Sequence, residues 1–291
     1  MYIKKLSLFN FKNYEIGEFE FIREINCIVG NNGVGKTNLL EAIHYLCITK
    51  SFKTNQDLVN VRFSSKYSMI EGVFEGSGGI IDKVSCVFGS DQKKKIKIND
   101  KELEKMSDIV GRYPVVVISP SDVMIILEWS EIRRKLLDGF ISQIDKTYLN
   151  KLIAYNNILL QRNSLLKKGE VNRDILEIYD EQLVLNAEYI YQKRKEYTTI
   201  IVKVFKEIYN YISGVEEEVD IIYRSNLEGI DYKLTLSNML DRDIMMQSSS
   251  YGIHKDDILF LIRGVSLKKY GSQGQQKTFT TSLKISLSDI L

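Results

Sequence analysis

The chain has 291 residues, with 44% hydrophobic and 27% charged side chains, which is the profile of an ordinary globular protein rather than a disordered one. Forty basic residues against 38 acidic ones leave a formal charge of +2, so a nucleic-acid role would depend on local patches. The three cysteines and two histidines lack the spacing of a disulfide framework or a metal site. The sequence shows neither a signal-type segment nor an apolar run of membrane-spanning length, so we expect a cytoplasmic protein without membrane contact.

Two strands are predicted at the start of the chain. Residues 2–9 and 18–22 alternate between polar and apolar side chains on either side of a turn region at Asn10–Gly17. A third strand is predicted at Ile25–Val29, a short β-branched segment typical of a buried strand.

A phosphate-binding P-loop, of the pattern G-x-x-x-x-G-K-T, follows this segment. After it, apolar residues recur at helical spacing from Lys36 to about Ile48, so the loop should open a helix. Glycine amides and a helix N-terminus suit phosphate groups, Lys36 can reach the β- and γ-phosphates, and the Thr37 hydroxyl can bind Mg²⁺. We therefore predict a site for ATP and Mg²⁺ made by Gly30, Asn31, Asn32, Gly33, Val34, Gly35, Lys36 and Thr37.

Beyond the polar stretch Thr49–Asn60, three segments read as an antiparallel meander. They are separated by glycine-containing turns and lie at Ser68–Glu75, Ile80–Phe88 and Lys93–Asn99. A further strand is predicted at Tyr113–Ile118, which has four β-branched residues in succession.

The composition changes to a helical pattern between residues 127 and 213. The longest apolar periodicity runs through Asp174–Ser213, where a helix of about 40 residues would be roughly 60 Å long. Gly169 separates it from the preceding helix, so the pair is expected to form an antiparallel arm. A plain helical subdomain without a lever-like role is the alternative.

Strand patterns return at Val219–Tyr223 and Asp257–Ile262. We therefore predict an α/β fold with a discontinuous head, residues 1–126 and 214–291, and an inserted helical arm at residues 127–213. The sequence Gly271-Ser272-Gln273-Gly274-Gln275-Gln276 is close to the L-S-G-G-Q signature of ABC-type ATPases. In that class the signature of one head caps the ATP of a second head, so Ser272, Gln273, Gly274 and Gln275 are expected to act in trans within a homodimer.

Several ordered motifs together resemble the RecF family of SMC-like ATPases. Besides the P-loop and the signature, these motifs are Leu6–Tyr14 ("L-x-N-F-R-N-Y" in the family), Ile118–Asp122, Arg133–Asp138 ("R-R-R-F-L-D") and Gly252–Asp257 ("G-P-H-R-D-D", with Ile253 in place of proline). The resemblance covers nearly the whole chain and implies an ABC/SMC-type head with a mixed sheet.

The resemblance also implies a function in recombinational DNA repair and replication restart. It implies an ATP-dependent homodimer that binds double-stranded DNA near gap junctions and works with RecR, alone or with RecO, to help load RecA. A nucleotide-binding scaffold without hydrolysis is the main alternative, and a transporter ATPase subunit is a weaker one.

One element of the family pattern is missing from the sequence. The acidic Walker B strand is expected after the signature, but the chain reaches Leu291 without it, and no catalytic acid is identified. We therefore expect a truncated head whose ATP hydrolysis is severely weakened.

Weaker candidates are basic triplets and one histidine. Lys93, Lys94 and Lys95, together with Arg133 and Arg134, could attract DNA phosphates, although solvated surface charge is the simpler interpretation. A structural role is favoured for His254 over metal or base chemistry, and Gln56 is a candidate nucleotide-sensing residue.

Overall fold

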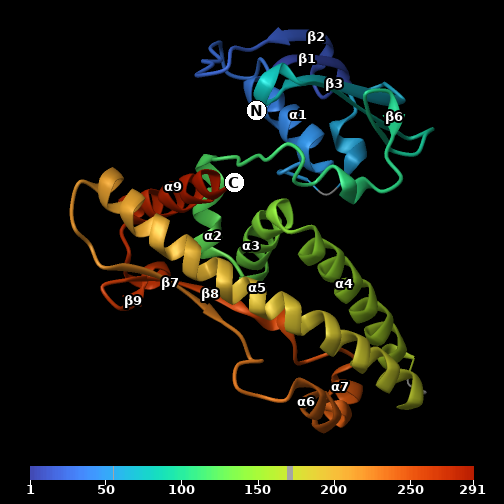
Figure 1. Cartoon of the computed structure of the whole chain (residues 1–291), viewed down its shortest axis with the longest axis vertical. Helices are drawn as coiled ribbons and strands as arrows, with labels where there is room; N and C mark the ends of the chain where they lie inside the picture. The colour runs from blue at the N-terminus through green and yellow to red at the C-terminus, as the bar shows by residue number, and fades with distance from the viewer. Residues whose placement is uncertain (55, 169–172) are drawn as a thin grey trace. The chain divides into compact units, whose positions relative to one another are not determined.

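The computed structural model describes residues 1–54, 56–168 and 173–291. The chain divides into two compact units, residues 1–117 and residues 118–291, which are described separately. Figure 1 shows a first unit built around a sheet and a second unit dominated by helices.

The first unit is a six-stranded antiparallel sheet in the order β2-β1-β3-β4-β5-β6. Its strands are β1 (Tyr2–Phe11), β2 (Tyr14–Glu20), β3 (Tyr67–Glu75), β4 (Ile81–Gly89), β5 (Lys95–Ile98) and β6 (Lys101–Glu102). These positions confirm the first predicted strand and the predicted meander. The second strand begins at Tyr14, inside the region Asn10–Gly17 that was predicted as a turn, because β1 and β2 pair as far as Phe11 and Tyr14. Short 3₁₀ turns occur at η1 (Asp57–Asn60), η2 (Ser77–Gly79) and η3 (Met106–Asp108).

Helix α1 (Lys36–Ile48) packs against β1, β3 and β4. The buried side chains of the strands alternate with a period of two, so one face of the sheet meets the apolar stripe of the helix. A Cβ at Gly72 would come within 2.7 Å of the Leu46 side chain, so this glycine allows the helix to approach the sheet closely. The core is formed by Leu6, Leu8, Phe11, Ile70, Val84 and Ile96 from the strands, with Leu39, Ala42, Tyr45 and Leu46 from α1.

Two predicted strands are not formed. Ile25–Val29 and Tyr113–Ile118 have no strand conformation, and Ile25 and Val29 are 82% and 88% exposed. A β-branched run forms a strand only within a hydrogen-bonded ladder, and neither segment belongs to either of the two sheets formed by the described residues. Both described sheets are antiparallel throughout, so the mixed sheet implied by the resemblance is not formed among the described residues.

The second unit contains the helical region. After η4 (Pro120–Val123) and α2 (Met124–Leu127) come α3 (Ser130–Ile144), α4 (Lys146–Lys167) and α5 (Arg173–Ser213), the last with 41 residues. Helices α4 and α5 pack against one another, as Figure 1 shows, which confirms the predicted helix pair. That this pair, called the arm below, is an insertion into the head stays a prediction. The predicted separation at Gly169 lies outside the described residues.

The rest of the second unit carries the signature. A small antiparallel sheet has the order β7-β8-β9, formed by β7 (Val219–Arg224), β8 (Asp257–Ile262) and β9 (Val265–Ser266). The remaining helices are α6 (Tyr232–Asn238), α7 (Leu240–Met246), η5 (Ile253–Lys255), α8 (Leu267–Tyr270) and α9 (Gln273–Ile290). Helix α9 packs along α5, and Figure 1 shows it beside the C-terminal end of that helix. The predicted grouping of residues 214–291 with residues 1–126 stays a prediction.

Candidate nucleotide-binding site

The P-loop is exposed and leads directly into α1. Gly33 and Gly35 have φ angles of 85° and 106°, which L-residues with side chains rarely adopt. Gly35 is the N-cap residue of α1, and it has no side chain that could occupy the first amides of the helix. The loop therefore presents backbone N–H groups and the positive end of the helix dipole to the surface.

Lys36 lies across this loop. Its Nζ donates to the carbonyl oxygens of Gly30 and Asn31 at 2.7 and 2.8 Å, so the ammonium group is held against the loop backbone. The Thr37 side chain is exposed in the first turn of α1. Together, the amides, the ammonium group and the hydroxyl are the donor set that a triphosphate with Mg²⁺ requires.

Asn13, in the turn between β1 and β2, supports the loop, a role that sequence reasoning did not identify. Asn13 Nδ2 donates to the carbonyl oxygen of Val34 at 3.0 Å, and Asn38 Nδ2 donates to Asn13 Oδ1 at 2.8 Å. A Cβ at Gly35 would come within 2.7 Å of both Asn13 amide atoms and 2.9 Å of the Tyr14 hydroxyl. The first motif of the chain thus packs on the P-loop, which leaves room only for glycine.

A buried carboxylate anchors the same motif to α1. Glu41 is fully buried and accepts hydrogen bonds from Lys12 Nζ at 2.5 Å and from the Ser51 hydroxyl. An ion pair taken out of water is stable only when its remaining lone pairs are satisfied, and here two donors share the carboxylate. The sequence signal for this ion pair was the presence of two opposite charges, Lys12 in the first motif and Glu41 on the P-loop helix.

The signature lies in the second unit, at the start of α9. Ser272 is the N-cap residue, and its hydroxyl accepts from the Gln275 amide at 3.2 Å while Gln275 Oε1 accepts from the Ser272 amide at 2.9 Å. This capping box fixes the first turn of the helix. Gln273 and Gly274 are exposed, so the turn is open to a ligand at the surface.

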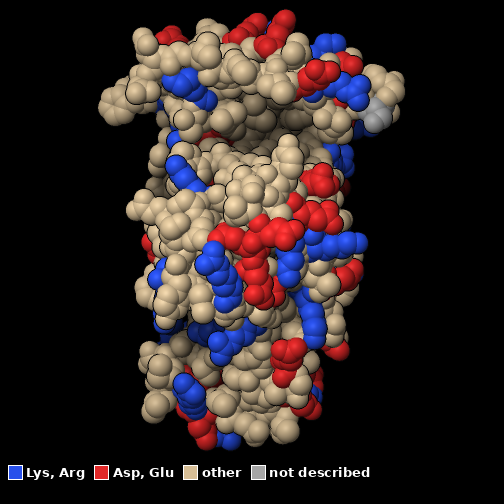
Figure 2. Space-filling model, turned by 90° about the vertical axis from the view of Figure 1, so that its left-hand side faces the viewer, with Lys and Arg blue, Asp and Glu red and all other residues tan. Residues whose placement is uncertain are grey.

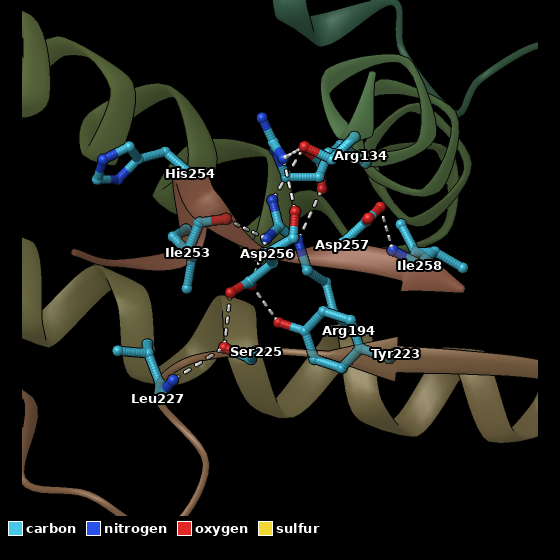
Figure 3. Close-up of polar contacts among 12 residues, drawn as sticks. Arg134, Arg194, Tyr223, Ser225, Leu227, Ile253, His254, Asp256, Asp257 and Ile258 are labelled. Carbon is cyan, nitrogen blue, oxygen red and sulfur yellow. Dashed lines mark hydrogen bonds and ion pairs between the residues drawn. The ribbon is translucent and has the colours of Figure 1, made fainter. Parts of the chain in front are cut away.

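The Gly252–Asp257 motif is part of a buried polar network rather than a surface site. Figure 3 shows Arg194, Tyr223 and Ser225 around Asp256. Asp256 accepts from Arg194 Nη1 at 2.8 Å, from Ser225 Oγ at 2.6 Å and from the Tyr223 hydroxyl. Burial raises the pKa of Asp256, while the positive charge of Arg194 opposes that rise. The network joins arm helix α5 to the start of β8.

His254 occupies a structural position in this motif. Its Nε2 lies 3.0 Å from the carbonyl oxygen of Ser249, which only accepts, so Nε2 carries the proton and Nδ1 accepts from the Tyr155 hydroxyl at 2.8 Å. Burial lowers the pKa of His254 to about 4. The ring is therefore neutral at physiological pH. Among the described residues, no group of three or more His, Cys, Asp or Glu side chains is placed to hold a metal ion.

Four of the five basic residues considered for DNA have intramolecular partners. Lys94 pairs with Asp57 at 3.0 Å and lies 4.4 Å from the centre of the Tyr45 ring. Arg133 pairs with Asp257 at 2.7 Å, and Arg134 Nη1 donates to the carbonyl oxygen of Asp256 at 2.5 Å. Lys93 and Lys95 are exposed, although Lys95 lies 3.3 Å from Glu102.

Gln56 is exposed and lies directly before η1 in the first unit, and its predicted nucleotide-sensing role stays a prediction.

On the face shown in Figure 2, basic and acidic side chains are interspersed.

Comparison with known proteins identifies the family. The family model described as RecF/RecN/SMC N terminal domain matches residues 2–289. "DNA replication and repair protein RecF" of Flavobacterium johnsoniae is 40% identical over all of this chain and 82% of its own length. The protein of the same description from Cytophaga hutchinsonii is 39% identical, covering 100% of this chain and 78% of that protein. The chain belongs to the RecF family.

Solved structures agree with this assignment. "Structure of the recombination mediator protein RecF-ATP in RecFOR pathway" superposes with a TM-score of 0.93 at 33% identity, covering 99% of this chain and 80% of that one. An Smc head bound to the C-winged helix domain of ScpA has a TM-score of 0.56 at 15% identity, covering 100% of this chain and 77% of that one, which shows the fold alone. The predicted α/β head of ABC/SMC type is confirmed. No helix within the described ranges has the length and apolar character of a membrane span.

Proposed function

We propose that this RecF-family chain is an ATP-dependent DNA-binding recombination mediator acting in DNA repair and replication. The observation that carries the proposal is the P-loop, in which Gly35 leaves the first turn of α1 open and Lys36 lies across the loop carbonyls. A RecF–ATP structure with 33% identity has the same fold over 99% of this chain. A triphosphate is the ligand class that this arrangement suits best.

The proposed ligand is ATP with Mg²⁺. The amides of Gly33 to Thr37 would surround the phosphates, and the Lys36 ammonium group would exchange its carbonyl partners for phosphate oxygens. The exposed Thr37 hydroxyl fits one position of the Mg²⁺ coordination sphere, with phosphate oxygens and waters as the other ligands. Bound Mg²⁺ neutralises part of the triphosphate charge.

The signature supports a homodimer formed with ATP. In the signature turn Ser272–Gln275, the exposed Gln273 and Gly274 lie at a helix N-terminus, and their backbone amides suit the γ-phosphate held by a second copy. We further propose double-stranded DNA and gap junctions as the nucleic-acid target. RecR and RecO are the proposed protein partners, in the cytoplasm, because the relatives carry the RecF description and a solved relative is assigned to the RecFOR pathway.

Titration of MgATP into the intact chain by calorimetry tests the nucleotide site, with Lys36→Ala as the variant. We expect saturable binding that Lys36→Ala weakens at least about tenfold, because a charged contact to phosphate is lost. Equal affinities of the two proteins would refute the site. DNA binding and phosphate release measured on the same samples distinguish a DNA-dependent ATPase from a nucleotide-binding scaffold.

A further inference from the structure

Glu217 connects three separate elements of the second unit. It lies in the short segment between α5 and β7, and its side chain is 10% exposed. Its Oε2 accepts from the Tyr209 hydroxyl at 2.7 Å, and its Oε1 accepts from Gln275 Nε2 at 2.8 Å and from Arg263 Nη2 at 3.0 Å. Tyr209 belongs to α5, Gln275 to the signature, and Arg263 to the turn between β8 and β9.

The contact with Gln275 determines how the signature turn is held. An amide side chain has one oxygen end and one nitrogen end, so the orientation that sends Nε2 to Glu217 also sends Oε1 to the Ser272 amide. Glu217 therefore selects the side-chain orientation that completes the capping box of α9. If Glu217 withdrew, Gln275 would lose the partner that fixes its amide.

The contact with Tyr209 joins the same carboxylate to the arm. The hydrogen bond from Tyr209 lowers the pKa of Glu217, so the carboxylate is ionised at neutral pH. The Tyr209 ring is fully buried, and Phe279 of α9 lies 4.5 Å from Phe205 and 6.1 Å from Tyr209 between ring centres. The end of α5 and the signature helix thus share both an apolar contact and a polar one.

We propose that Glu217 is a positioning residue that couples the C-terminal end of arm helix α5 to the conformation of the signature turn Ser272–Gln275. A change in α5 caused by duplex DNA bound to the arm is transmitted to the signature turn through the hydrogen bonds of Tyr209 and Gln275 with Glu217. The consequence for ATP-dependent pairing of two copies rests on the proposed function, whereas the coupling itself lies within one chain.

The test compares three variants of the intact chain. Tyr209→Phe removes one hydroxyl and keeps the buried ring, and Glu217→Gln removes the shared charge. Lys206→Gln is the matched control, because it breaks an ion pair of 3.0 Å between α5 and Asp220 of β7 without touching Glu217. Amide hydrogen exchange of residues 272–276 is measured with and without a short DNA duplex, and dimerisation with MgATP is measured by sedimentation.

We expect Tyr209→Phe and Glu217→Gln to speed exchange in the signature turn at least about threefold, while Lys206→Gln leaves it unchanged. We also expect the ratio of dimerisation constants with and without DNA to fall toward one in the first two variants only. If Glu217 had a purely structural role, the variants would lower the dimer association constants with and without DNA by the same factor, and the ratio of the two constants would not change.

Unchanged exchange in Tyr209→Phe would overturn the proposal, and so would faster exchange with an unchanged DNA-dependent ratio. If the native chain binds neither MgATP nor DNA, the proposed function fails on that protein alone. In that case, the comparison of exchange between Tyr209→Phe and Lys206→Gln still decides whether the coupling exists.

Discussion

Single glycines and polar side chains determine the shape of the candidate nucleotide site. Gly35 combines a positive φ angle with close contact to Asn13 and Tyr14, so both its backbone and its surroundings exclude a side chain. The P-loop pattern in the sequence predicts the glycine but not the residues that press on it. Those residues lie more than 20 positions earlier in the chain and are brought near by the first β-hairpin.

Gly35→Ala should weaken MgATP binding by at least about tenfold. The added Cβ must displace Asn13 or shift the loop, which moves the amides that would surround the phosphates. Calorimetric titration measures the effect. Gly139→Ala is the control, since Gly139 lies inside α3 with open space around it and alanine there should stabilise the helix by about 0.5–1 kcal/mol. Equal affinities of both variants would contradict this account of the loop.

His254 predicts a pH dependence of stability in the second unit. Its folded pKa of about 4 lies below the ordinary value of 6.5, so protonation favours the unfolded chain. The contribution, about 3 kcal/mol at most, is complete above about pH 6.5 and is lost as the pH falls toward 4.

Denaturant unfolding of His254→Gln and of the parent, followed from pH 7 to pH 4, measures the effect. We expect the free energy of unfolding to fall less steeply with pH in the variant than in the parent. The parent protein measured under the same conditions is the reference. Parallel curves for the two proteins would show that His254 is not the group responsible.

At the scale of elements, sequence periodicity predicts the bounds of helices and strands well, but it does not predict which strands find a partner. The alternation in β1, β3 and β4 and the helical spacing in α1 and α5 give elements close to their predicted bounds. Ile25–Val29 has the composition of a strand but no strand conformation, because a strand also requires a neighbour and composition does not reveal one. The role of Glu217 could not be predicted for a related reason, since its partners are distant in the sequence. Within the run Glu216–Glu218 it resembles solvated surface charge.

Phe279 should be the main apolar contact between α9 and the arm. It is fully buried among Phe205, Tyr209 and Phe260. Phe279→Ala is expected to lower the free energy of unfolding of the second unit by about 3–5 kcal/mol, since it leaves a cavity in an aromatic cluster. Thermal and denaturant unfolding measure the loss. Leu185→Ala on α5 changes a side chain that is 67% exposed, so it should cost less than about 0.5 kcal/mol. Similar losses in both variants would refute the assignment.

For the whole molecule, the net charge does not indicate whether the protein binds DNA. The exposure and partners of individual lysines indicate which of them could contact phosphates. Lys93 is exposed, whereas Lys94 is held by Asp57 and the Tyr45 ring. If the first unit contacts DNA through this triplet, Lys93→Gln should reduce the slope of log affinity against log salt by about 0.9. Fluorescence anisotropy with a labelled duplex at several salt concentrations measures the slope.

Lys94→Gln is the informative comparison for this prediction. It should lower the stability of the first unit by about 1–2 kcal/mol, because a partly buried ion pair and a contact with an aromatic ring are lost. Its effect on the salt slope should be small. An unchanged slope in Lys93→Gln would exclude that lysine as a phosphate contact.

The network around Arg194 and Asp256 has a practical consequence for such titrations. Both side chains are almost completely buried, and ions in solution screen buried charges far less than exposed ones. Rising ionic strength should therefore release DNA from the surface long before it loosens the junction between α5 and β8. Affinity lost in high salt then reports on the surface contacts, and the protein recovered by dialysis should bind DNA again without refolding.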